Sequence, residues 1–171
     1  FDLAIRITRL ENSSLIARRL APFHVQVCGS PELIAKYGEP THPRDLASVP
    51  CIIDTNGRWL SNWPFIGDNT DIISVSVSGP IEVNSPMAAR AAAIEGLGFT
   101  ILPDFIAARD IEDGRLIPVL NDRILTGGGI FAVYPHRRYL PAKVRVFVDY
   151  LAAWFKKFPC PAEPRKRPAA V

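Results

Sequence analysis

The chain has 171 residues, of which 48% are apolar and 22% are charged, and its net charge at pH 7 is +3. This composition excludes a disordered chain, and the length allows one or two small domains. No apolar run is long enough to cross a membrane, and the charge is too small to predict nucleic-acid binding by itself.

Apolar runs, capping residues and Gly/Pro punctuation predict alternating strands and helices. In the first third they predict strands at residues 1–7, 15–20 and 23–29, a short helix at 31–37 and a helical turn at 44–47. In the middle they predict strands at 51–54 and 72–77, a loop or strand at 59–65, a helix at 86–95 and a strand at 99–102. Beyond these they predict a helix at 103–109, strands at 116–120 and 130–134 after a turn at 126–129, and a long helix at 141–158. Such alternation favours an α/β fold.

The most informative stretch is the Ala-rich helix at 86–95 and the strand that follows it. Ser85 and Pro86 are typical of a helix start, and Gly96 or Gly98 can take the left-handed conformation that ends one. Backbone N–H groups at this helix start are available to an anion. The alternative is an ordinary helix and strand of a core.

No pattern in the sequence predicts an enzyme. There is no serine elbow and no phosphate-binding loop, and the three histidines lack metal spacing, so we expect no metal and no cofactor. Cys28 as a nucleophile remains a remote alternative, because nothing positions a base beside it. Three cysteines without a CxxC pair indicate a reducing compartment and hence a cytoplasmic protein.

Some residues suit a binding site instead. Arg6 ends an apolar run, so we expect it at the carboxyl edge of a sheet, where it can hold a carboxylate. The alternative is an ion pair with Asp2 or Glu11. Trp59, Trp63 and Phe65 can line an apolar pocket, or they can belong to the core.

Several short motifs follow one another in order: Asp2-Leu3-Ala4-Ile5-Arg6, Cys28-Gly29-Ser30-Pro31, Pro43-Arg44-Asp45-Leu46, Val83-Asn84-Ser85, Gly96-Leu97-Gly98-Phe99, Asp113-Gly114-Arg115-Leu116 and Pro141-Ala142-Lys143-Val144. Each is weak alone. In this order, up to about Phe158, they resemble the C-terminal effector-binding domain of LysR-type transcriptional regulators.

The resemblance implies an α/β fold like that of type-2 periplasmic binding proteins, with two α/β subdomains around a ligand cleft. On that pattern residues 1–22 and 135–158 belong to the first subdomain, 23–134 form the second, and 159–171 are a disordered tail. The family carries a winged helix-turn-helix, a linker helix and opening βα units before the part that this chain resembles. We therefore expect an N-terminally truncated chain with an incomplete first subdomain.

The resemblance also implies what the protein does. A small effector, often an acid or an aromatic compound, binds in the cleft and shifts a homodimer or homotetramer between two arrangements. Promoter DNA is bound by the helix-turn-helix and not by these residues, and no membrane is involved. The implied effector-binding residues are Arg6, Thr8, Trp63, Phe65, Asn84 and Ser85. The alternative is the solute-binding component of a transporter, which shares the fold.

Overall fold

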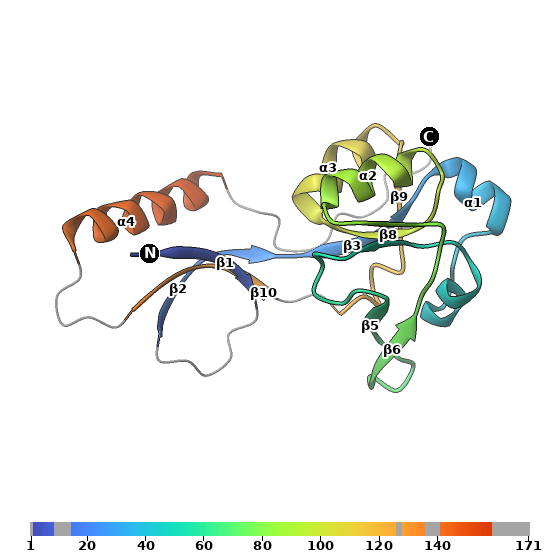
Figure 1. Ribbon diagram of the computed structural model, residues 1–171, viewed down its shortest axis with the longest axis horizontal. Helices are drawn as coiled ribbons and strands as arrows, with labels where there is room; N and C mark the ends of the chain where they lie inside the picture. The colour runs from blue at the N-terminus through green and yellow to red at the C-terminus, as the bar shows by residue number, and fades with distance from the viewer. Residues whose placement is uncertain (1, 9–14, 126–127, 136–140, 159–171) are drawn as a thin grey trace. The chain divides into compact units, whose positions relative to one another are not determined.

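A computed structural model of the protein describes residues 2–8, 15–125, 128–135 and 141–158. The chain forms two compact units (Figure 1). Unit 1 combines Phe1–His24 with Thr126–Glu163, whereas the described part of unit 2 is the continuous stretch Val25–Leu125. The tail expected at 159–171 lies outside the described residues.

The sheet of unit 1 is built around a strand that arrives from late in the chain. β10 (Gly128–Pro135) lies between β1 (Ala4–Thr8) and β2 (Leu15–Phe23) and is antiparallel to both. β1 and β2 therefore depend on β10, and not on each other, for their ladder hydrogen bonds. Both predicted strands are confirmed, and each continues further towards its carboxyl end than predicted.

One face of this sheet is covered by α4 (Ala142–Lys157), which confirms the predicted long helix (Figure 1). Val144 and Val148 of α4 pack on Ala132 of β10 in a buried cluster. Their spacing of four residues places both side chains on one side of the helix, so that side faces the sheet.

Unit 2 has a similar arrangement at its own centre. β3 (Val25–Gly29), which follows β2 along the chain, lies between β8 (Thr100–Pro103) and β9 (Ile117–Val119), antiparallel to both. Every residue of β3 is buried, as in a strand covered on both faces. The chain passes from unit 1 to unit 2 just before β3 and returns to unit 1 just before β10. In both units, the first strand after such a crossing therefore occupies the middle of a three-stranded sheet.

A parallel pair of strands extends this region of unit 2. β4 (Ile52–Asp54) pairs with β7 (Ile81–Val83) in parallel. The pair joins the stretch before β8 through a bridge between Cys51 and Phe99, where the Ile52 N–H donates to the Phe99 carbonyl at 2.7 Å. The sequence did not predict β7, because three residues between a Gly-Pro pair and a helix cap carry too little pattern.

Two helices, α2 (Pro86–Ile94) and α3 (Asp104–Glu112), lie beside each other against β8 (Figure 1). Ala89 and Ala93 of α2 are fully buried, because small side chains let the helix approach the strands closely. Gly96, with a φ of +73°, takes the predicted left-handed conformation just after α2. The remaining elements are α1 (Pro31–Tyr37), the 3-10 helix η1 (Pro43–Ser48) and the antiparallel hairpin of β5 (Asn62–Ile66) and β6 (Ile72–Ser76).

The second boundary between the units differs from the expectation. The first crossing, between His24 and Val25, lies close to the expected boundary after residue 22. The second precedes β10, although residues up to 134 were expected in the second subdomain. The reason is that Gly128 and Gly129, expected in a turn, pair as strand with β2 and draw all of β10 into the sheet of unit 1.

A buried carboxylate ties α2 to α3. Asp110 of α3 has no exposed side-chain surface. Its Oδ1 accepts a hydrogen bond from Arg90 Nη2 and forms an ion pair with Arg115 Nη2, both at 2.7 Å, and its Oδ2 accepts a hydrogen bond from Arg90 Nε. The backbone N–H of Arg115 also donates to the Asp110 carbonyl at 2.8 Å. The negative charge is thus fully paired, as a buried charge must be.

We expect Asp110→Ala to lower the free energy of unfolding of unit 2 by about 2–4 kcal/mol, because charge-assisted bonds to two arginines are lost. Urea denaturation followed by the fluorescence of Trp63, which is buried in unit 2, measures this. Asp113→Ala is the matched control, since its carboxylate pairs with Arg115 at 3.1 Å but is 51% exposed, and we expect a cost below about 1 kcal/mol. Equal losses in the two variants would contradict a structural role for the burial of Asp110.

Candidate functional site

Two arginines of unit 1 share one face of its sheet. Arg6 of β1 and Arg19 of β2 lie opposite the same residue of β10, Phe131. Residues directly opposite each other in antiparallel strands point to the same face. This is the face that α4 leaves uncovered, because Arg18, the neighbour of Arg19, points to α4 and donates to Asp149 Oδ1 at 2.5 Å.

Arg6 does not end its strand as predicted. It is the middle residue of β1, which continues through Thr8, the other residue expected to bind an effector in this unit. The strand is longer because its partner β10 begins earlier than predicted. Asp2, considered as an ion-pair partner of Arg6, pairs instead with Lys143 at 2.7 Å, and Glu11 lies outside the described residues.

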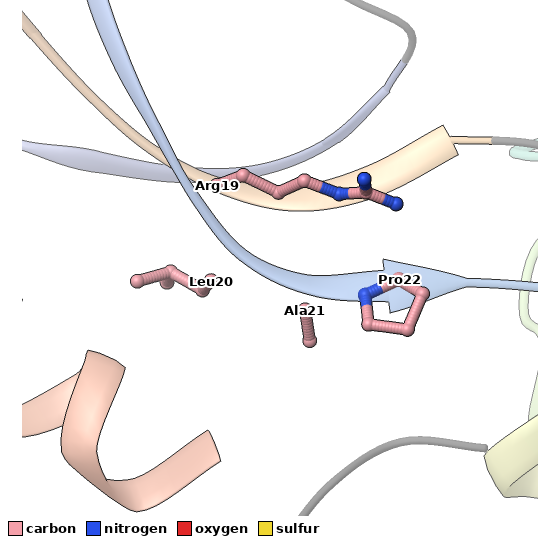
Figure 2. A pocket seen from close by; sticks show the side chains of 4 residues that line it. All are labelled: Arg19, Leu20, Ala21 and Pro22. Atoms are coloured by element: carbon pink, nitrogen blue, oxygen red, sulfur yellow. The ribbon is translucent and has the colours of Figure 1, made fainter. Parts of the chain in front are cut away.

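A β-bulge interrupts β2 directly after Arg19. Ala21 lies opposite Ile130 and Arg19 lies opposite Phe131, so Leu20 has no partner of its own in β10. Bulges bend a strand locally and re-aim its side chains. A hollow of about 400 Å³ lies along this part of the strand, lined by Arg19, Leu20, Ala21 and Pro22 (Figure 2).

The Arg19 side chain extends along β2 towards the carboxyl end of the strand, in the direction of Pro22 (Figure 2). Its Nη2 donates to the Gly128 carbonyl at 3.4 Å. A Cβ added to Gly129 would lie 3.1 Å from Arg19 Nε and 2.7 Å from the ring of Phe131. Gly129 therefore leaves the space in which the guanidinium of Arg19 and the ring of Phe131 come together.

A second polar edge lies in unit 2, where the parallel strands β4 and β7 both end. Carboxyl ends of parallel strands meet at one edge of a sheet, which is where α/β folds bind ligands. The backbone N–H of Thr55 donates to the Val83 carbonyl at 2.7 Å, and its Oγ1 donates to the same oxygen at 3.1 Å. Asn56 Nδ2 donates to the Asn84 carbonyl at 3.0 Å, so the turn after β4 is tied to the end of β7.

Asn84 and Ser85 lie at this edge, at the start of α2, as the capping pattern predicts. The Asn84 side chain is exposed, and Ser85 Oγ accepts a hydrogen bond from the Met87 N–H at 3.3 Å. Ser85 is therefore the N-cap of α2. The predicted helix start is confirmed, whereas binding of an effector at this edge stays a prediction.

Trp63 and Phe65 lie in the core of unit 2. The side chains are 2% and 0% exposed respectively, and Trp63 Nε1 donates to the Leu60 carbonyl at 2.9 Å. This placement corresponds to the alternative that both are core residues, and neither offers an open aromatic face to a ligand. Their strand β5 nevertheless pairs with the segment that leads to the second crossing, through a bridge between Phe65 and Ile124.

Arg19, Thr55 and Asn56 were not predicted from the sequence. Arg19 sits in the expected strand at 15–20, but nothing in the sequence reveals the bulge that follows it or its register with Arg6. Thr55 and Asn56 had a usable signal, because a polar turn directly after a buried strand marks the carboxyl edge of a sheet. That signal becomes decisive only when β7 is recognised as the parallel partner of β4.

The buried thiols do not form a reactive or metal-binding group. Burial, with a smaller effect of the negative charges of Asp104 and Asp110, raises the pKa of the Cys28 thiol far above its usual value. Burial raises the pKa of Cys51 to about 12. In the part of the chain that the structure describes, no cluster of His, Cys, Asp and Glu side chains is suited to holding a metal ion.

The LysR substrate binding domain family matches residues 1–156. The chain belongs to this family. Its motif pattern and its α/β fold thus point to the same group of proteins. LysR-type regulators control transcription and are not enzymes. In the described ranges of this chain, no helix is long and apolar enough to span a membrane.

Curated relatives are transcription regulators. The chain is 33% identical over 150 residues to the HTH-type transcriptional regulator PtxR of Pseudomonas aeruginosa, covering 88% of this chain and 48% of PtxR. It is 31% identical over 155 residues to DmlR of Escherichia coli K12, covering 90% of this chain and 50% of DmlR. The chain therefore spans about half the length of these relatives.

Solved structures of LysR-type regulatory domains have the same fold. The regulatory domain of AphB in Vibrio vulnificus is 32% identical, with a TM-score of 0.76 over 90% of this chain and 75% of that one. The regulatory domain of CrgA from Neisseria meningitidis is 30% identical, with a TM-score of 0.73 over 90% of this chain and 74% of that one. The α/β fold expected from the sequence is thereby confirmed.

We expect both Cys28 and Cys51 to be inert towards Ellman's reagent at pH 8, because the attacking species is the thiolate and both thiols stay protonated. A Cys160→Ser variant leaves Cys28 and Cys51 as the remaining thiols of this chain. The absorbance of the product released from the reagent should not rise until guanidinium is added to unfold the protein. Titration of the denatured variant is the control that both thiols are intact. Reaction of the native variant at the rate of free cysteine would contradict the burial.

Proposed function

We propose that this chain is the sensing part of a DNA-binding LysR-type regulator, and that a small anionic or aromatic metabolite bound by it controls transcription. The family match and the regulators among its relatives support this role. The observation that carries the ligand class is the arginine-bearing face of unit 1, on which Arg6 and Arg19 lie opposite Phe131. Arginine binds carboxylates through two parallel hydrogen bonds.

Regulation of this kind requires only that the effector binds one arrangement of the protein more tightly than another. The hairpin of β5 and β6 offers a path within unit 2. Ile66 N–H donates to the Arg123 carbonyl at 2.7 Å, and Leu125 N–H donates to the Pro64 carbonyl at 3.2 Å. A shift of this hairpin therefore moves the segment that leads into β10.

The proposal includes a homodimer or homotetramer in the cytoplasm, with promoter DNA bound by a helix-turn-helix other than the described residues. The outer side of α2 supports association, since Met87 is 54% exposed and Leu97, just beyond the helix, is 43% exposed. Apolar side chains grouped with exposed alanines suit contact with the first subdomain of a partner copy.

The alternative, a solute-binding component of a transporter, shares the fold and is therefore not separated from the proposal by fold alone. The curated relatives named above are regulators, which favours the proposal. Reading the coding sequence that precedes Phe1 separates the two functions. A helix-turn-helix followed by a long helix supports the regulator, whereas a secretory signal there would overturn it.

We expect Arg6→Ala to weaken binding of an anionic effector by about 10- to 100-fold, the loss that corresponds to one charge-assisted hydrogen-bonded pair. Calorimetry on the protein at its full natural length measures this. Lys143→Ala is the control, because it also removes one positive charge of unit 1, but one that is already paired with Asp2. Unchanged affinity in Arg6→Ala would remove Arg6 from the site.

A further inference from the structure

We propose that Arg6 and Arg19 together bind one small dianion, either a dicarboxylate or a phosphate monoester. This inference rests on the proposed function and names the chemical class of the effector. It adds Arg19, which the sequence analysis did not single out, as a second cation of the site.

The first argument is the position of the two arginines. Both lie opposite Phe131, on the face of the sheet that α4 does not cover. One strand separates β1 from β2, so the two backbones are roughly 10 Å apart, twice the usual strand spacing. Long side chains that project from the same face across that distance can reach the two ends of one small molecule.

The second argument is the direction of the Arg19 side chain. Its guanidinium lies beside Gly128 and Gly129, and its Nη2 donates to the Gly128 carbonyl. These glycines lie opposite Phe23 and Pro22, at the carboxyl end of β2. The bulge at Leu20 and the glycine space together place a cation at the end of the sheet where β1 and β2 both finish.

The third argument is charge. Within the described residues, neither Arg6 nor Arg19 forms an ion pair with a carboxylate, whereas Arg18, Arg90, Arg115 and Arg123 all do. The residues that the register places opposite one another on this face, namely Ala4, Val133 and Ala17 in one row and Arg6, Phe131 and Arg19 in the next, include no acid.

Two cations that pair with no carboxylate of the described residues repel each other across one face, and a ligand with two negative charges relieves that repulsion. A monoanion pairs with one guanidinium and leaves the other uncompensated. Phe131, in the strand between them, is only 6% exposed, so the two arginines and not the ring would contact the ligand. A short carbon chain between two anionic groups suits two cations that are held apart by one strand.

The test is calorimetry on the protein at its full natural length with malonate, succinate, glutarate, inorganic phosphate and, as the monoanion, propionate. We expect at least one of the dianions to bind more tightly than propionate. Arg19→Ala should weaken that binding by about 10- to 100-fold, as should Arg6→Ala. Arg18→Ala is the matched control, because it removes an equal charge one residue away but on the α4 face, and we expect less than about a threefold change.

Gly129→Ala tests the position of Arg19 without changing the charge. A Cβ there collides with both Arg19 and Phe131, so dianion affinity should fall although both arginines remain. Circular dichroism and the melting temperature show whether each variant is folded, and Arg19→Ala, an exposed substitution, keeps the test valid if Gly129→Ala does not fold.

Equal losses in Arg18→Ala and Arg19→Ala would overturn the proposal, and so would the absence of any dianion binding. If inorganic phosphate binds, no dicarboxylate binds, and Arg19→Ala weakens the phosphate binding, the result supports the proposal and assigns the site to phosphate monoesters. Control of transcription by an uncharged aromatic metabolite would leave the proposed function intact and overturn only this inference.

Discussion

The pairing of β10 with β1 and β2 is the interaction on which unit 1 depends. β1 and β2 have no ladder with each other, and each pairs with a strand far away in sequence, as Ala4 does with Val133. The register of this pairing also decides which side chains face α4. A slip of one residue would turn Arg6 and Arg19 towards the helix and Arg18 away from it. The fold of unit 1 and its candidate site therefore rest on the same set of backbone hydrogen bonds.

The protein uses arginine in two different ways. In unit 2, Arg90 and Arg115 surround the buried carboxylate of Asp110, and the charges cancel within the protein. In unit 1, Arg6 and Arg19 are exposed and form no ion pair with the described residues. Cancelled charge stabilises a local packing arrangement, whereas uncancelled charge on a defined surface is available to a ligand. Whether an arginine is already ion-paired therefore distinguishes structural arginines from candidate binding residues, without any comparison with related proteins.

Most elements were predictable because their signals are local. Ser85 caps a helix as expected, Gly96 takes the left-handed conformation, and the apolar spacing of α4 predicted the long helix. The failures involve pairing between distant segments. Gly128 and Gly129 have turn chemistry but become strand, because β2 supplies a partner for them. For the same reason Arg19 could not be recognised, since its place beside Gly129 depends on a bulge that only the pairing creates.

The discontinuous composition of unit 1 sets an order in which the protein can fold during synthesis. The described strands and helices of unit 2 all lie within the continuous stretch Val25–Leu125. β1 and β2 are made before this stretch, whereas β10, the strand that joins them in one sheet, is made after it. The ladders that β10 forms with β1 and β2 therefore close only when every described element of unit 2 has already been synthesised. Unit 2 can thus begin to fold while this sheet of unit 1 is still waiting for its central strand.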